Sequence, residues 1–252
     1  MEMRESEWFG YRRADFTFAD FTFEDRDALI VFPNSDKNGH WMMKMEYFGA
    51  FPAVELELLS RGWHLTYLKN VNRWGTDTDN DAKDRFADFV SRQFGLDSAF
   101  TCVGMSCGGL CSVNFASRYP ERVNFLYLDA PVMNLYSCPM GFGKGDVLPN
   151  GWNELQDAYG FDLPALLTYR EHPMDRLSVL SEHRIPAALI YGDSDTTVPW
   201  EENGRVMEEH YRARNLPFYI EGKPGCGHHP HGPTDVMALC DYIENSIIRD
   251  AE

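Results

Sequence analysis

Gly104-Met105-Ser106-Cys107-Gly108 decides how this chain is interpreted, because it has the G-x-S-x-G pattern of a nucleophile elbow. The apolar run Ala99-Phe100-Thr101-Cys102-Val103 precedes it, and residues 110–119, which are typical of a helix, follow it. This order predicts a strand, a sharp turn and a helix. Small residues around the turn let strand and helix approach closely while the serine adopts a strained conformation. We therefore predict that Ser106 is a nucleophile at the top of a sheet, beside a helix N-terminus that favours negative charge.

An aspartate and a histidine follow in settings that suit a catalytic triad. The apolar residues 187–191 lead into Gly192-Asp193-Ser194-Asp195, and the strand-like residues 218–220 lead into a glycine-rich loop that contains His228. The carboxyl ends of parallel strands meet at one edge of a sheet, so these distant residues can converge. We predict that His228 is the base that activates Ser106 and that Asp195 orients the imidazole.

The sequence leaves some of these assignments open. His228 is preferred because it directly follows Gly225-Cys226-Gly227, and Asp195 is preferred because it lies farther into its loop. Cys107 is disfavoured as the nucleophile, because an elbow turns its middle residue outward. Cys226 and the nearby histidines could also form a metal cluster, but zinc usually takes ligands from two separated pairs, so we predict no metal and no other cofactor. The alternatives are His229 and His231 for the base, and Asp193 and Asp129 for the acid.

A serine hydrolase needs two backbone N–H groups to stabilise the oxyanion that forms on the substrate. We predict that Cys107, the residue after the nucleophile, supplies one of them. The second is expected from the loop after the strand-like residues 40–44, with Glu46 as the candidate. The candidates for substrate binding are Tyr47, Trp152 and Trp200, although Trp200 could simply begin a helix.

Strand-like and helix-like segments alternate along the 252 residues, which predicts a mainly parallel sheet covered by helices on both faces. We predict one domain over residues 1–252. Residues 133–184 are far longer than a crossover requires, and we predict a largely helical cap there, although this segment could be scaffold without substrate contact. The expected strands are 15–23, 28–32, 40–44, 63–68, 99–103, 123–128, 187–191 and the segment near 218; the expected helices are 51–60, 81–94, 110–119, 201–214 and 234–249.

The composition excludes several classes of protein. The formal net charge of −16 argues against a nucleic-acid or anionic-membrane partner. No segment has the length and apolarity of a membrane span, and the first seven residues lack the apolar core of a signal peptide. The six cysteines contain no C-x-x-C pair, which favours reduced, buried thiols. We therefore expect a cytoplasmic protein, and its oligomeric state stays open.

The whole chain resembles the α/β-hydrolase superfamily. It is most similar to bacterial esterase-like proteins of the acetyl-xylan-esterase and prolyl-oligopeptidase-related type. The similarity lies in residues 41–49, 104–109, 129–132, 192–199 and 223–232. The chain departs from that group at Cys107 and at Lys44, where arginines are usual, which puts in doubt any substrate contact that the arginine at position 107 would make.

The resemblance implies an α/β-hydrolase fold and hydrolysis of a carboxylic ester through an acyl-enzyme. A small ester is the expected substrate, with a short acyl group such as acetyl on a carbohydrate or oligosaccharide. A peptidase or amidase using the same triad is one alternative, and a ligand-binding protein without catalysis is another. The motifs do not exclude a lyase or a C–C bond hydrolase.

Overall fold

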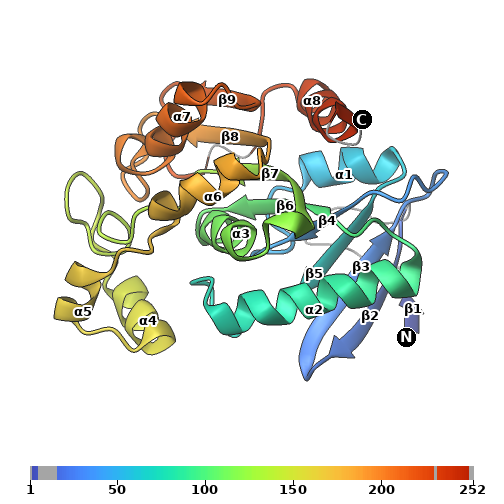
Figure 1. Ribbon diagram of the computed structural model, residues 1–252, viewed down its shortest axis with the longest axis horizontal. Helices are drawn as coiled ribbons and strands as arrows, with labels where there is room; N and C mark the ends of the chain where they lie inside the picture. The colour runs from blue at the N-terminus through green and yellow to red at the C-terminus, as the bar shows by residue number, and fades with distance from the viewer. Residues whose placement is uncertain (1, 5–15, 230–231, 250–252) are drawn as a thin grey trace.

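The computed structural model describes residues 2–4, 16–229 and 232–249, and these residues form a nine-stranded sheet in the order β1-β2-β3-β5-β4-β6-β7-β8-β9 (Figure 1). The first four strands of this order pair antiparallel, and the strands from β5 to β9 pair parallel. The strands are β1 (Glu2–Arg4), β2 (Thr17–Phe23), β3 (Arg26–Phe32), β4 (Trp41–Lys44), β5 (His64–Leu68), β6 (Phe100–Met105), β7 (Val123–Asp129), β8 (Ala187–Gly192) and β9 (Phe218–Lys223).

Helices cover both faces of this sheet. The apolar residues of α2, α3, α6 and α7 join one buried cluster with one face of the strands, and those of α1 and α8 join a second cluster with the other face. Met43 belongs to the first cluster and Met42 to the second, as expected where side chains alternate along a strand. The helices are α1 (Ala53–Ser60), α2 (Asp77–Phe94), α3 (Cys107–Arg118), α4 (Pro149–Tyr159), α5 (Leu163–Thr168), α6 (Leu177–Glu182), α7 (Gly204–Ala213) and α8 (Val236–Arg249), with short 3-10 turns at Pro120–Arg122, Pro173–Arg176 and Trp200–Glu202.

This architecture confirms the predicted mainly parallel sheet between two helical layers. Between β7 and β8, the chain forms α4 and α5, which lie to one side of the sheet, and then α6, which packs beside α3 (Figure 1). Within the described residues, no helix combines the length and apolarity needed to cross a bilayer.

The bounds of all five predicted helices shift in the structure, and two of the helices differ most. The first, α2, begins at Asp77 rather than at residue 81, because its polar first turn is bound to the preceding loop: the Asp79 carboxylate accepts the Val71 N–H at 2.9 Å and the Thr76 hydroxyl at 3.3 Å. The predicted helix over residues 201–214 is interrupted at Asn203.

The interruption at Asn203 has a long-range cause. The Asn203 side-chain oxygen accepts the backbone N–H groups of Met133 and Asn134, both at 3.0 Å, and its nitrogen donates to the Pro199 carbonyl at 3.0 Å. This buried side chain therefore joins the start of α7 to the segment that follows β7, instead of continuing a helix.

Candidate active site

Ser106 occupies a sharp turn between β6 and α3. Its backbone angles are φ 52° and ψ −121°. Residues other than glycine rarely adopt such a positive φ. Hydrogen bonds hold the turn on both sides. The Ser106 N–H donates to the Asp129 carbonyl at 2.9 Å, and the Ser106 carbonyl accepts the N–H groups of Gly109 at 2.9 Å and Val132 at 3.1 Å. The surrounding backbone therefore sustains the strained serine.

Two glycines permit the close packing of this turn. A Cβ atom at Gly104 would lie 2.2 Å from the Gly108 carbonyl oxygen and 2.3 Å from Ser112 Oγ. A Cβ atom at Gly109 would lie 2.4 Å from the Pro131 Cβ. Any side chain at either position would force β6, α3 and the segment after β7 apart.

The three residues predicted as a triad meet in one hydrogen-bonded chain. Ser106 Oγ lies 2.9 Å from His228 Nε2, and His228 Nδ1 lies 2.8 Å from Asp195 Oδ2. The other oxygen of Asp195 accepts the N–H groups of Thr197 and Val198, each at 2.8 Å. A carboxylate beside Nδ1 places the imidazole proton on that nitrogen, which leaves Nε2 to accept the serine proton.

The alternative acids and bases have other partners in the structure. Asp193 Oδ1 accepts the Gly225 N–H at 2.7 Å, so Asp193 connects the end of β8 to the loop before His228. The ring of His229 lies beside the ring of His228, with centroids 4.7 Å apart. His231 lies outside the described residues.

Asp129, at the end of β7, also serves the histidine loop. Its Oδ2 accepts the Gly232 N–H at 2.7 Å. Burial raises the pKa of Asp129 to about 6, although the hydrogen bond from Gly232 and the nearby lysines Lys44 and Lys223 act in the opposite direction. Asp129 is thus a buried carboxyl that holds the loop after His228.

The loop after β4 lies against the elbow helix. A Cβ atom at Gly108, in the first turn of α3, would lie 3.5 Å from the Glu46 backbone nitrogen and 3.3 Å from its Cβ. The Met45 N–H donates to the Val103 carbonyl at 2.9 Å, so this loop continues the pairing of β4 with β6. Cys107 is the first residue of α3, where backbone N–H groups have no partner within the helix. Glu46 therefore lies beside the first turn of the helix that Cys107 begins.

Arg73 is a residue of this region that the sequence analysis missed. Its Nη1 donates to the Tyr47 hydroxyl at 3.3 Å, and its Nε donates to Glu154 of α4 at 2.7 Å. Tyr47 in turn interacts with the buried Cys107 thiol. The available signal was the position of Arg73 in the loop that follows β5, at the same edge of the sheet as the triad.

Trp152 and Trp200 are the two tryptophans predicted to bind substrate. The Trp200 ring stacks on Tyr191, with centroids 3.7 Å apart, and a Cβ atom at Gly204 would lie 2.5 Å from that ring. These contacts match the interpretation of Trp200 as the start of a helical segment. Trp152, in α4, is half-buried against the core. The substrate contacts of both tryptophans stay predictions.

The segment after β7 is bound to the loop that carries Asp195. The Asp146 N–H donates to the Thr196 carbonyl at 2.7 Å, and the Thr196 hydroxyl donates to the Asp146 carboxylate at 2.6 Å. Glu202 accepts the Ser137 hydroxyl at 2.7 Å and the Lys144 N–H at 2.6 Å.

The part of the chain that the structure describes contains no group of three His, Cys, Asp or Glu residues that could hold a metal ion.

Comparison with known families supports the fold. The family model described as "alpha/beta hydrolase fold" matches residues 60–169, which include the elbow with Ser106. The chain has the α/β-hydrolase fold. Curated protein sequences give no significant match to this chain.

Many solved structures resemble this chain, and three of them are given next. They are puromycin hydrolase (18% identity, TM-score 0.68, covering 92% of this chain and 38% of that one), dipeptidyl peptidase 4 of Porphyromonas gingivalis (15%, 0.67, 94% and 36%) and Est1E of Butyrivibrio proteoclasticus (12%, 0.61, 93% and 98%). The chain spans little more than a third of the two longer enzymes, and nearly the whole of Est1E. Identities this low establish the shared fold and do not establish a shared substrate.

Proposed function

We propose that this protein is a serine hydrolase that cleaves carboxylic esters through an acyl-enzyme. The observation that carries the proposal is the continuous chain from Ser106 Oγ to His228 and on to Asp195, at 2.9 and 2.8 Å. A serine hydroxyl is a weak nucleophile on its own, and a neighbouring base that is itself oriented by a carboxylate supplies the required activation.

The mechanism follows from the roles assigned to these residues. Ser106 attacks the ester carbonyl while His228 Nε2 takes its proton, and Asp195 stabilises the imidazolium. The backbone N–H groups of Cys107 and Glu46 stabilise the tetrahedral oxyanion. His228 then protonates the departing alcohol. In the second half of the reaction, His228 takes a proton from a water molecule that attacks the acyl-enzyme, and it returns that proton to Ser106 Oγ as the carboxylic acid leaves.

We assign short acyl esters of carbohydrates, acetyl esters first, as the substrate class. The support is the resemblance to acetyl-xylan-esterase-like proteins and the presence of aromatic side chains, Tyr47 and Trp152, that suit stacking on a sugar ring. Residues 133–184 act in this proposal as a cap that limits substrate size. Its helix α4 packs against the core through Leu155, and two hydrogen bonds also join it to the body of the protein: Arg73 with Glu154 at 2.7 Å and the Tyr159 hydroxyl with the Trp74 carbonyl at 2.9 Å.

A peptidase or amidase using the same triad is the second candidate. The similarity to puromycin hydrolase and to a dipeptidyl peptidase favours it. Their TM-scores, 0.68 and 0.67, are close to the 0.61 of Est1E. Amide and ester hydrolysis share the acyl-enzyme route, so the triad by itself does not separate the two.

The deciding experiment measures turnover on matched substrates, with Ser106→Ala as the control. The substrates are 4-nitrophenyl esters from acetate to octanoate, an acetylated xylo-oligosaccharide and a set of aminoacyl 4-nitroanilides. We expect fast acetate turnover that falls with chain length, acetate release from the sugar, and a loss of at least about a thousandfold in Ser106→Ala.

Other outcomes redirect the assignment. Cleavage of the anilides with slow ester turnover would favour the peptidase. Equal activity of the wild type and Ser106→Ala on every substrate would remove Ser106 from the mechanism. Fluorophosphonate labelling of the wild type, and not of Ser106→Ala, reports on the nucleophile independently of substrate choice.

A further inference from the structure

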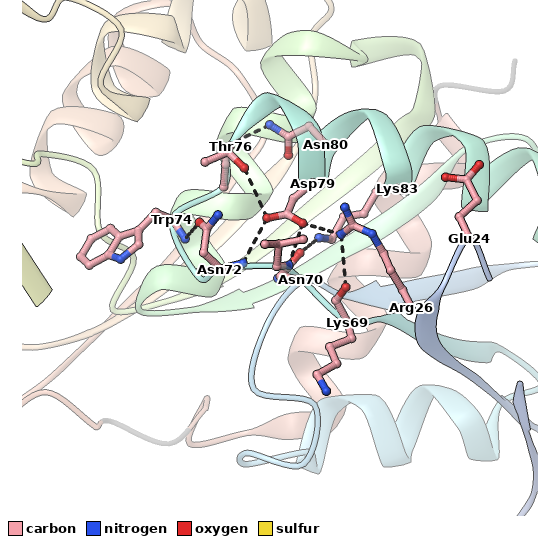
Figure 2. A network of polar contacts seen from close by, with 12 residues as sticks. Glu24, Arg26, Lys69, Asn70, Asn72, Trp74, Thr76, Asp79, Asn80 and Lys83 are labelled. Carbon is pink, nitrogen blue, oxygen red and sulfur yellow. Dashed lines mark hydrogen bonds and ion pairs between the residues drawn. The ribbon is translucent and has the colours of Figure 1, made fainter. Parts of the chain in front are cut away.

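A buried lysine and an asparagine connect α2 to the loop of residues 45–50, which we call the oxyanion loop because it contains Glu46. The Lys83 ammonium, 1% exposed, donates to Asn70 Oδ1. Asn70 Nδ2 donates to the Met45 carbonyl at 2.7 Å and also to the Glu46 carboxylate. Figure 2 shows Asn70 and Lys83 within the polar network around Asp79.

Lys83 determines which way the Asn70 amide points. An ammonium group can only donate hydrogen bonds, so it requires the amide oxygen on its own side. Both N–H bonds of the Asn70 amide are thereby directed at the two acceptors of the oxyanion loop. The reversed amide would place a donor against the ammonium and an acceptor against a carbonyl and a carboxylate.

The loop that carries Asn70 is bound to the buried first turn of α2. Asp79, in the first turn of α2, is buried and binds Arg26 as well as the Val71 N–H. The other end of the oxyanion loop is also bound to a buried lysine, since Lys44 Nζ donates to the Ala50 carbonyl at 3.0 Å. The loop is therefore bound at both ends, and Asn70 is the side chain that binds both the Met45 carbonyl and the Glu46 carboxylate.

We propose that Asn70, oriented by Lys83, is a positioning residue that holds the Glu46 backbone N–H in place for the oxyanion; this inference rests on the proposed function. The Glu46 nitrogen lies beside the first turn of α3, since a Cβ atom at Gly108 would be 3.5 Å from it. An oxyanion donor acts mainly in the transition state, so its displacement lowers kcat and leaves KM nearly unchanged.

The first test is Asn70→Asp. It keeps the shape of the side chain and the contact with Lys83, but directs an oxygen at the Met45 carbonyl and the Glu46 carboxylate. We expect kcat on 4-nitrophenyl acetate to fall about 10- to 100-fold, with KM within about twofold of the wild type. The matched control is Asn80→Asp. Asn80 is buried in the same network, but its amide donates to the Gly75 carbonyl at 3.1 Å, so kcat is expected to stay within about twofold.

A second readout separates positioning from general damage. Sulfur is a weaker hydrogen-bond acceptor than oxygen, so the ratio of turnover on a matched ester and thionoester reports on the oxyanion donors. We expect that ratio to shrink in Asn70→Asp, whereas a structural defect lowers both rates equally. The double variant Asn70→Asp with Glu46→Gln exchanges donor and acceptor and should restore part of kcat.

If Asn70→Asp does not fold, Lys83→Met gives the same information, because it releases the amide orientation and should shrink the ratio to a smaller extent. A wild-type ester-to-thionoester ratio in the folded variant overturns the positioning role. Failure of this inference is distinguishable from failure of the proposed function: an inactive Ser106→Ala beside a fully active Asn70→Asp rejects the positioning role alone, and an active Ser106→Ala rejects the function.

Discussion

Asp195 Oδ2 lies 2.8 Å from His228 Nδ1, and the second oxygen of the same carboxylate is occupied by two backbone N–H groups. Asp193, only two residues earlier, binds the Gly225 N–H instead. Both aspartates therefore serve the histidine loop, but only one of them contacts the imidazole.

The two aspartates should respond very differently to removal of their charge. In Asp195→Asn, the amide can favour the wrong imidazole tautomer, and we expect kcat to fall about 10⁴-fold. In Asp193→Asn, the remaining oxygen can still accept the Gly225 N–H, and we expect a loss of less than about tenfold. Steady-state kinetics on 4-nitrophenyl acetate measure both, and equal losses would mean that Asp195 has no special role.

Gly104→Ala should destabilise the protein strongly. The new methyl group would overlap the Gly108 carbonyl oxygen and Ser112 Oγ, so β6 and α3 must separate. We expect a loss of about 3 kcal/mol in the free energy of unfolding, measured by urea denaturation. The matched control is Gly227→Ala, where no described atom outside residues 226–228 lies within 4 Å of the new Cβ, and we expect a change within about 0.5 kcal/mol. Similar losses in both would remove the steric argument.

The stability effect of Asp129→Asn should depend on pH. Burial raises the pKa of Asp129 to about 6, above the value of about 3.9 that an aspartate has in an unfolded chain. Between these values the folded state binds more protons, so ionisation of Asp129 lowers stability as the pH rises from about 4 to about 6, and this cost persists at higher pH.

Asparagine removes that cost and can still accept the Gly232 N–H. We therefore expect Asp129→Asn to gain about 1–3 kcal/mol relative to the wild type on going from pH 4 to pH 7.5. Thermal unfolding at several pH values tests this, and a difference between variant and wild type that does not change with pH would contradict it.

The Cys107 thiol should be dispensable, because its proposed contribution is the backbone N–H. Burial raises the pKa of this thiol, and the side chain is only 4% exposed, so the reactive thiolate is disfavoured. We expect iodoacetamide to leave wild-type activity intact and Cys107→Ala to keep kcat within about fivefold. Rapid inactivation that depends on Cys107 would show that the thiol is accessible and close to the reaction.

Local sequence was sufficient for the elements that the triad needs. The elbow, the loop after β8 and the loop after β9 each follow a strand, and residues 99–119 alone indicate the order of strand, turn and helix around Ser106. The interruption of the predicted helix 201–214 was not predictable in this way, because it depends on the bonds of Asn203 to residues 133 and 134.

The residues that support the site could not be predicted from the sequence, for the same physical reason. Arg73, Asn70 and Lys83 are polar residues without a motif, and each acquires its partner only when a strand end, a loop and a helix come together. The stacking of the Trp200 ring on Tyr191 is likewise a contact between residues nine positions apart that no motif announces.

The hydrogen bonds that join residues 137–146 to Thr196 and Glu202 limit how this protein could be redesigned. An insertion between two strands is often treated as an exchangeable module. In this chain, the insertion between β7 and β8 is hydrogen-bonded to Thr196, the residue after Asp195. A graft from another protein that replaces only the residues between these two strands would therefore remove those bonds. Transplanting residues 137–146 together with 196–202 as one unit is the exchange that this architecture permits.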